Sequence, residues 1–134
     1  MTRLADWRQR LAAYLVETRA AHFRLGRHDC FLFALGALDA MTGSAHLPVF
    51  AGRYDTVLEG ARIGQAVYGC ATYRQLFRRL LAPASNPRPG DIALVPTELG
   101  VAGAILQRPG ALYLVSDIGW TVAPTPAAAE FYRV

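Results

Sequence analysis

The residue with the clearest chemical potential is Cys30, which closes the run Arg27-His28-Asp29-Cys30 directly before a long apolar segment. A thiol in the first turn of a helix can ionise readily, because exposed backbone N–H groups and the helix dipole favour the nucleophilic thiolate. Asp29 acts in the opposite direction, since a carboxylate one residue away disfavours a second negative charge, and apolar surroundings do the same. A reactive Cys30 therefore needs a cationic or basic partner.

Three histidines could supply that partner, and all of them lie in the first half of the chain. His28 is two residues before Cys30, where an adjacent side chain usually points away from the sulfur. His46 lies beyond the apolar segment, roughly 20 Å from Cys30 if that segment is a helix and the chain continues outward. His22 could fold back. We take Cys30 as the candidate nucleophile and His28 and His22 as candidate bases, although an exposed or locally hydrogen-bonded side chain is the preferred hypothesis for each histidine.

The second cysteine, Cys70, is expected to be a small core residue. It and Cys30 show none of the paired spacings of zinc sites or thioredoxin-like motifs, and a disulfide between them would be unusual in a reducing cytosol. The histidines and the scattered acids also lack the spacing of metal ligands. The sequence therefore predicts neither a metal nor another cofactor.

The elements around Cys30 explain how the thiol would be positioned. Gly26 breaks the preceding helix, and Asp29 suits the N-cap of the next one. The segment from Cys30 to Met41 is apolar on nearly all sides, which predicts a central helix buried on most faces and ended by Thr42-Gly43.

Helices and strands occupy different halves of the chain. We expect an amphipathic helix over residues 5–20, an irregular crossing over 44–54, a helix from Asp55 or Thr56 to Tyr68, and a helix capped by Thr72. Behind a proline-rich turn at residues 82–89, short β-prone runs follow at 91–95, 101–107, 112–116, 120–123 and 130–134. This order predicts one α+β domain over residues 1–134, with N-terminal helices and the central buried helix packed on a small C-terminal antiparallel sheet.

Composition narrows the class of partner. The formal charge of +4 comes from fourteen arginines and no lysine, and only Arg74, Arg78 and Arg79 cluster, as a solvated helix face. Nucleic-acid binding works through clustered charge, so no nucleic-acid partner is expected.

No stretch approaches the ~20 apolar residues of a membrane span, and the charged first residues lack a signal peptide's apolar core, which predicts synthesis in the cytoplasm. The many tyrosines and phenylalanines look exposed and suggest protein partners.

Two motifs carry a family resemblance, Leu25-Gly26-Arg27-His28-Asp29-Cys30 and Pro89-Gly90-Asp91 followed by the apolar run 92–95. Through them the chain resembles, over nearly its whole length, the NlpC-type cell-wall peptidases, a papain-like cysteine peptidase superfamily. More closely, it is similar to small proteins of unknown function encoded in tail modules of tailed phages and gene transfer agents. The residues that carry this second resemblance are Trp7, Leu11, 26–30, 41–43, 52–55 and 131–134.

The resemblance implies a histidine at the start of the second strand, and there the chain departs from it. The matching segment, residues 99–106, is apolar, and no histidine follows His46. An unassisted thiol with a pKa near 8.5 is only a few per cent thiolate at neutral pH, and the missing imidazole would also be the acid for the leaving group. The resemblance thus implies the fold of a peptidase with an incomplete catalytic dyad.

These observations predict a phage tail-tip structural or adaptor protein, made in the host cytoplasm and then part of the virion tail, where it contacts other proteins of the tip or hub. The alternative is an active cysteine peptidase or amidase that acts on peptidoglycan during phage entry, with Cys30 as nucleophile and His22 or His28 as base. A basic nucleic-acid adaptor is a third class, which would show binding that weakens steeply with salt.

Overall fold

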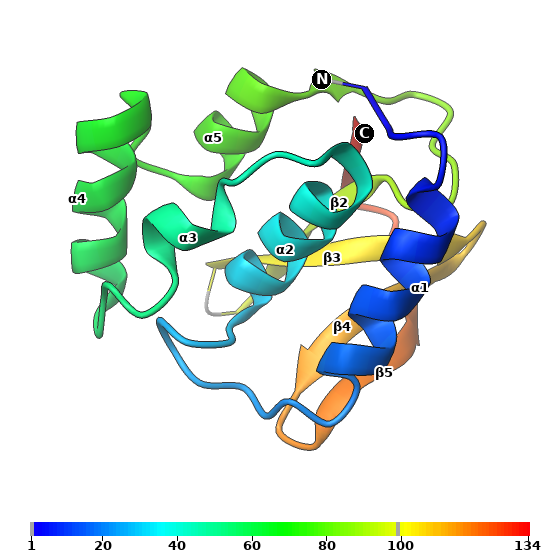
Figure 1. Ribbon diagram of the computed structural model, residues 1–134, viewed down its shortest axis with the longest axis horizontal. Coiled ribbons are helices and arrows are strands. Elements are labelled where there is room, and N and C mark those ends of the chain that lie inside the picture. The colour runs from blue at the N-terminus through cyan, green and yellow to red at the C-terminus, as the bar shows by residue number, and fades with distance from the viewer. Residues whose placement is uncertain (1, 99) are drawn as a thin grey trace.

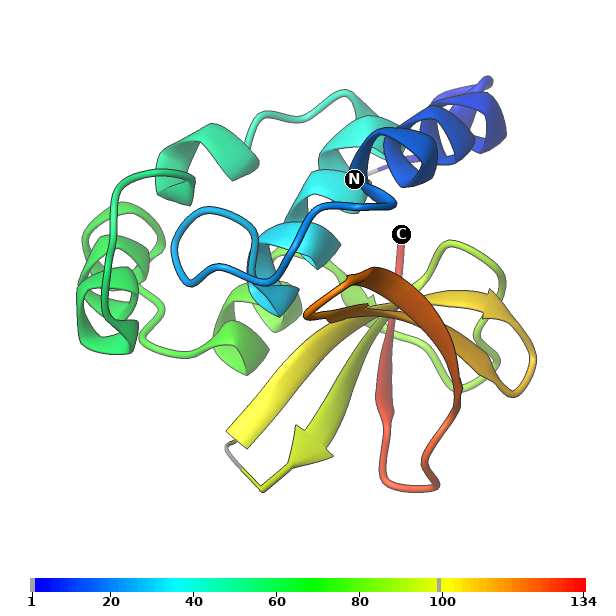
Figure 2. The ribbon, with the colours of Figure 1, turned by 90° about the horizontal axis from the view of Figure 1, so that it is seen from below.

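The computed structural model describes residues 2–98 and 100–134, which form helices on one side of a single antiparallel sheet (Figures 1 and 2). The α+β class is therefore confirmed. The helices are α1 (Trp7–Thr18), α2 (Cys30–Thr42), α3 (Leu47–Phe50), α4 (Val57–Tyr68) and α5 (Tyr73–Leu80). The strands are β1 (Ala82–Pro83), β2 (Ile92–Thr97), β3 (Gly100–Arg108), β4 (Ala111–Ser116), β5 (Gly119–Pro124) and β6 (Glu130–Arg133), in the sheet order β1-β6-β2-β3-β4-β5.

Helix α2 lies at the centre of the molecule, between α1, α3 and the sheet (Figure 1). Its start is fixed by Asp29, whose carboxylate accepts a hydrogen bond from the Leu32 N–H at 2.9 Å. Its end is fixed by Gly43, which has a φ of 74° and so takes the left-handed conformation that favours glycine. Every residue from Phe31 to Leu38 is buried, so the prediction of a central helix with these two caps is confirmed.

The sheet is apolar on both faces because a hydrophobic core packs against each of them. The face toward α2 contributes Ile92, Leu94, Ile105 and Tyr132 to the main core. The opposite face forms a second, smaller core, and Figure 2 shows the sheet curling around that side. Its buried members are Ala93, Val95, Ala104, Leu106 and Leu112. Successive residues of a strand point to opposite faces, so β2 and β3 must be apolar at nearly every position.

The pairing between β3 and β4 is incomplete. β3 pairs with β2 along the whole length from Gly100 to Ile105, but with β4 only from the Ile105↔Tyr113 pair onward. Both strands continue past that pair, β3 back to Gly100 and β4 on to Ser116. The β2–β3 and β4–β5 hairpins therefore diverge at this end, as Figures 1 and 2 show.

Several local predictions were wrong. Residues 44–54 are not wholly irregular, because α3 forms one turn there, with Pro48 in its first turn. The carboxylate of Asp39 accepts hydrogen bonds from the N–H groups of His46 at 3.0 Å and Leu47 at 2.7 Å, which stabilises that turn. The proline-rich segment contains β1, which pairs with β6. Helix α1 is shorter than residues 5–20 by two residues at each end.

The surface also differs from the expectation. Among the tyrosines and phenylalanines only Phe23 is exposed, at 46%, and all six tyrosines are buried or half-buried. The large exposed apolar residues are instead aliphatic: Val16, Val57, Leu58, Val67, Ile118 and Val122. Arg74 and Arg78 lie within 3.1 and 3.9 Å of the Glu130 carboxylate on β6, so this arginine face is partly neutralised. No helix in the described ranges has the length and hydrophobicity needed to cross a membrane.

Candidate functional site

Cys30 is the first residue of α2, and its half-buried thiol is free. It lines a cleft of about 960 Å³ between the start of α2, the helices α4 and α5, and the diverging ends of β3 and β4. Cys70 lines the same cleft and is buried, as expected of a small core residue. The other walls are mainly apolar and include Phe23, Leu25, Phe31, Phe50, Val57, Ala61, Leu76, Val101 and Val115.

The loop before α2 is held by the carboxylate of Asp29, which is 1% exposed. Besides the Leu32 N–H, this carboxylate accepts hydrogen bonds from the Gly26 N–H at 3.0 Å and from the Tyr54 hydroxyl group. Asp29 is thus a helix cap that ties three chain segments together. Three donors already occupy its oxygens, so it is poorly placed to take a proton from Cys30.

Burial decides the ionisation of Cys30. Desolvation is the largest effect and raises the pKa of the thiol above its ordinary value, and the charge of Asp29 raises it further. Hydrogen bonds from the backbone of Gly103, Phe31 and Cys30 itself lower the pKa, but they do not outweigh burial. The backbone N–H groups at the helix terminus and the buried surroundings therefore shift the thiol pKa in opposite directions, as expected, and the effect of the surroundings is the larger one.

The three histidines make their contacts elsewhere. The ring nitrogen Nδ1 of His22 contacts the carbonyl oxygen of Asp117, and Nδ1 of His46 lies 2.7 Å from the Tyr68 hydroxyl group. The ring of His28 packs edge-on against Phe33, with ring centroids 5.9 Å apart. None of these histidines is among the described residues that line the cleft.

The strand opposite the thiol is β3. Val101, Gly103 and Ile105 share the face toward α2, and of these Val101 lines the cleft. Gly103 lies directly beneath the first turn of α2, because a Cβ atom there would come within 2.7 Å of the Cys30 carbonyl oxygen. This strand presents a valine and a glycine to Cys30. None of the described residues that line the cleft is a histidine, and the carboxylate next to the thiol, that of Asp29, already accepts three hydrogen bonds.

Alkylation of Cys30 should therefore be slow. In a Cys70→Ala background, which leaves one thiol, iodoacetamide at pH 7.5 should react several-fold more slowly than with the same protein unfolded in urea, because the thiol is half-buried and its pKa is raised. The rate should keep rising with pH beyond 9. Fast alkylation that reaches its plateau below pH 8 would contradict this description of the site.

His28 should make the fold sensitive to mild acid. Its Nε2 atom is buried and has no hydrogen-bond partner among the described residues, and burial lowers the pKa of the imidazole despite the opposing charge of Asp29. The unfolded chain then binds the proton more tightly than the folded one, so stability is lost as the pH falls from about 6.5 through the lowered folded pKa. His28→Phe keeps a ring against Phe33 and should flatten the dependence of the unfolding free energy on pH between 5 and 7.5. An unchanged slope would show that another group causes it.

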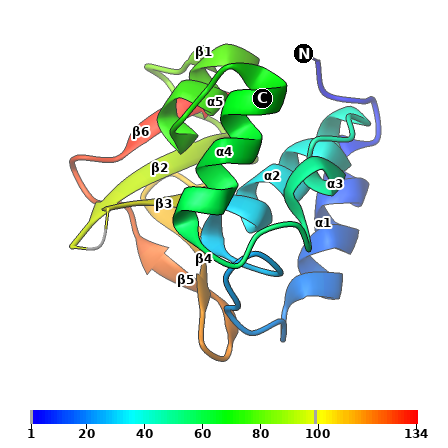
Figure 3. The same ribbon diagram turned by 90° about the vertical axis from the view of Figure 1, so that its left-hand side faces the viewer.

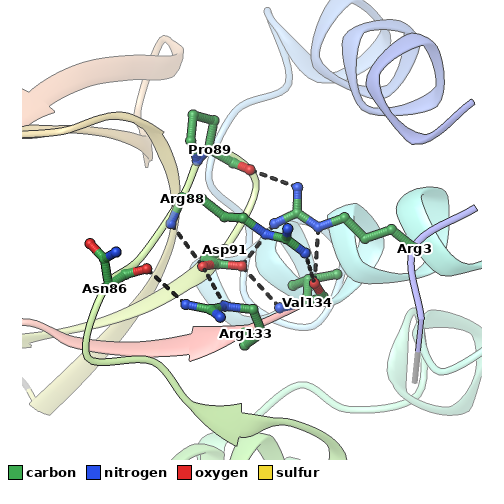
Figure 4. Close-up of polar contacts among 7 residues, drawn as sticks. All are labelled: Arg3, Asn86, Arg88, Pro89, Asp91, Arg133 and Val134. Atoms are coloured by element: carbon green, nitrogen blue, oxygen red, sulfur yellow. Dashed lines mark hydrogen bonds and ion pairs between the residues drawn. The ribbon is translucent and has the colours of Figure 1, made fainter. Parts of the chain in front are cut away.

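The sequence did not predict a second polar cluster, which forms around the aspartate of the Pro-Gly-Asp motif. Asp91, of Pro-Gly-Asp, precedes β2 rather than beginning it and is completely buried. Figure 4 shows its carboxylate between Arg3 at 2.8 Å and Arg133 at 3.5 Å, with hydrogen bonds from the N–H groups of Arg88 and Val134. It joins the two ends of the described chain and does not line the cleft. The motif's aspartate is therefore a structural residue.

No group of three or more histidine, cysteine or acidic side chains within residues 2–98 and 100–134 is arranged to hold a metal ion.

Comparison with known proteins identifies a family. The model of a domain of unknown function, DUF6950, matches residues 2–134. No curated protein and no solved structure matches the chain. With the match covering all but its first residue, the chain belongs to the DUF6950 family.

Proposed function

We propose that this protein is a structural or adaptor component of a phage or gene-transfer-agent tail tip, and that its peptidase-like domain does not hydrolyse peptide bonds. The observation that carries the proposal is the surroundings of Cys30. The thiol stands at the head of the central helix and faces a cleft, but β3 presents Val101 there and burial raises the thiol pKa. The nucleophile position is occupied while the base position is apolar.

Hydrolysis by a thiol needs a base to ionise it and an acid to protonate the leaving group. The cleft offers few candidates. Burial raises the pKa of the Tyr73 phenol, so it is no base at neutral pH. Arg74 pairs with Glu130, and Glu98 lies exposed in the turn between β2 and β3. A role in assembly requires none of these groups to transfer a proton.

The peripheral helix α4 supports a role in assembly. Figure 3 shows α4 on the outer side of the molecule, and Val57, Leu58 and Val67 on it are each more than half exposed. Val67 and Ile63 also line a second hollow of about 560 Å³, together with Pro48, Val49 and Arg53 of the α3 segment. Exposed apolar surface of this kind is typical of sites that contact other proteins.

The experiment compares the wild-type protein with Cys30→Ala on purified peptidoglycan and soluble muropeptides, with an active cell-wall peptidase as a positive control. We expect no product from either variant. When the gene for this protein is deleted and a copy is supplied separately, the Cys30→Ser copy should restore particle assembly and infectivity as well as the wild-type copy does. Cys30-dependent cleavage would overturn the proposal, as would normal particles formed without the gene.

One observation favours the second candidate, an active cysteine peptidase or amidase acting on peptidoglycan. The thiol lines a cleft large enough for a peptide, and the unpartnered Nε2 of His28 is only two residues away in the chain. This candidate predicts that Cys30→Ala and either His28→Ala or His22→Ala abolish muropeptide cleavage. Equal and negligible turnover in all four proteins would exclude it.

A further inference from the structure

The open edge of β3 borders the cleft. In the pairing of β2 with β3, Thr97 is opposite Gly100, and the register then runs through Val95↔Ala102 and Ala93↔Ala104. Residues of antiparallel strands alternate between pairs that exchange both hydrogen bonds and pairs that exchange none. Gly100, Ala102 and Ala104 therefore direct their N–H and C=O groups toward β2. Those of Val101 and Gly103 point the other way.

On that other side β4 does not pair with β3 beyond Ile105. The first turn of α2 covers Gly103, whose backbone is hydrogen-bonded to the Cys30 thiol. Val101 has no such cover, and it lines the cleft together with Val115 of β4. Within residues 2–98 and 100–134 its N–H and C=O groups have no partner, so they form one unused rung of a β-ladder, a donor and an acceptor side by side, at the wall of an apolar cleft.

The opposite wall is the inner face of α4. Val57, Gly60, Ala61 and Gly64 lie on this face and line the cleft, and Val57 is 67% exposed. An amphipathic helix normally buries its apolar face against the core. Here the cleft separates part of that face from the core residues Phe31 and Leu76, so an apolar occupant would complete the packing.

We infer that the cleft binds an extended, apolar segment of a partner polypeptide, which pairs with β3 at Val101 and places alternate side chains against α4 and Phe31. The inference rests on the proposed function, for which it names the kind of partner that the Cys30 cleft would take. A peptide backbone complements the partial charges of the open rung, because it carries a donor and an acceptor at the same spacing. An acyl chain would fill the volume but leave the rung unpaired.

The test uses ¹⁵N-labelled full-length protein and the uncharged peptide acetyl-Thr-Val-Thr-Val-Thr-amide as the probe, with two analogues N-methylated on alternate amides. We expect saturable shifts of the amide resonances of Val101 and Ala102. One analogue should bind and the other should not, because only alternate N–H groups of a strand face its neighbour. Val101→Pro removes the outward N–H without touching the β2–β3 ladder and should weaken binding about tenfold or more.

Val122→Pro is the matched control, because Val122 lies on the edge strand β5 and its N–H points away from β4. This variant should bind the peptide like the wild type. No saturable shift, equal binding of both analogues, or unchanged binding by Val101→Pro would overturn the inference. Binding of dodecanoate in place of the peptide, or concentration-dependent shifts of the same amides without any probe, would assign the cleft to an apolar small molecule or to a second copy.

If Val101→Pro does not fold, the two methylated analogues decide the matter with wild-type protein alone. Mass spectrometry of the peptide after the titration separates the two proposals. Cys30-dependent cleavage of the probe would contradict the proposed function, whereas failure to bind without cleavage would contradict only the inference about the cleft.

Discussion

Asp91→Ala should lower the free energy of unfolding by about 3–5 kcal/mol, because it leaves the buried guanidinium group of Arg3 without its counter-charge. Arg3 is 5% exposed in its side chain, and the Asp91 carboxylate is fully buried. Removing the carboxylate also leaves the N–H groups of Arg88 and Val134 without their acceptor. Each unsatisfied buried group costs on the order of 1–3 kcal/mol, so the single substitution removes more than one interaction. Urea unfolding followed by circular dichroism measures the loss.

Asp6→Ala is the matched control for this prediction. Asp6 pairs with Arg10 at 2.9 Å, but both side chains are about half exposed, and the Asp6 side chain makes no capping hydrogen bond to α1. Exposed pairs of this kind contribute roughly 0–1 kcal/mol, so the unfolding free energy should hardly change. Adding Arg3→Met to Asp91→Ala should recover part of the loss, because one uncompensated buried charge disappears. Equal stability of Asp91→Ala and Asp6→Ala would show that the cluster in Figure 4 contributes little.

The parts of the fold that sequence predicts are those fixed by neighbours in the chain. The start and end of α2 follow from Asp29 and Gly43, and the starts of α4 and α5 follow from Thr56 and Thr72, whose side chains accept hydrogen bonds from N–H groups three residues on. The β-prone runs and the turn residues between them also placed the five main strands within two residues of their ends. Caps and periodicity are local, so no tertiary information was needed.

The parts that sequence did not predict depend on distant partners. Helix α3 is too short to show periodicity, and the hydrogen bonds that stabilise it come from Asp39, eight residues before Leu47. Glycine in the interior of a helix such as α4 normally weakens the helix. In the structure a Cβ atom at Gly64 would come within 2.6 Å of the Cys70 carbonyl oxygen, so the close approach of that loop requires glycine. Close approaches between segments are invisible in a single sequence.

The candidate site also has parts that the sequence predicts and parts that it does not. Cys30 and its cap were identified from the motif, and the apolar character of the matching strand was visible in residues 99–106, of which Leu99 lies outside the described residues. The end of the β3–β4 pairing at Ile105, next to the place where the first turn of α2 packs against Gly103, had no signal in the sequence. The thiol could be found by reading the chain, but the cleft beside it could not.

Gly26→Ala should be about as damaging as Asp91→Ala, at roughly 2–5 kcal/mol of unfolding free energy. Gly26 has a φ of 79°, which costs an L-residue roughly 1–2 kcal/mol, and its Cβ atom would overlap the Tyr54 carbonyl oxygen and lie 2.9 Å from the carbonyl carbon. Relieving such an overlap typically costs a further ~1–3 kcal/mol. Moving Tyr54 would also disturb its hydroxyl contact with Asp29, and with it the cap of α2.

Gly52→Ala measures the conformational part of this effect alone. Gly52 has nearly the same φ, 77°, but a Cβ atom there would have no neighbour within 4 Å. Both substitutions carry the same conformational cost, so Gly52→Ala should lose only about 1–2 kcal/mol, and the difference between the two variants measures the contact with Tyr54. If the variants are equally stable, the glycine serves only the turn. If Gly26→Ala is the less stable one and its Cys30 is also alkylated faster, the glycine of the motif is needed to seat the loop that caps α2 and buries the thiol.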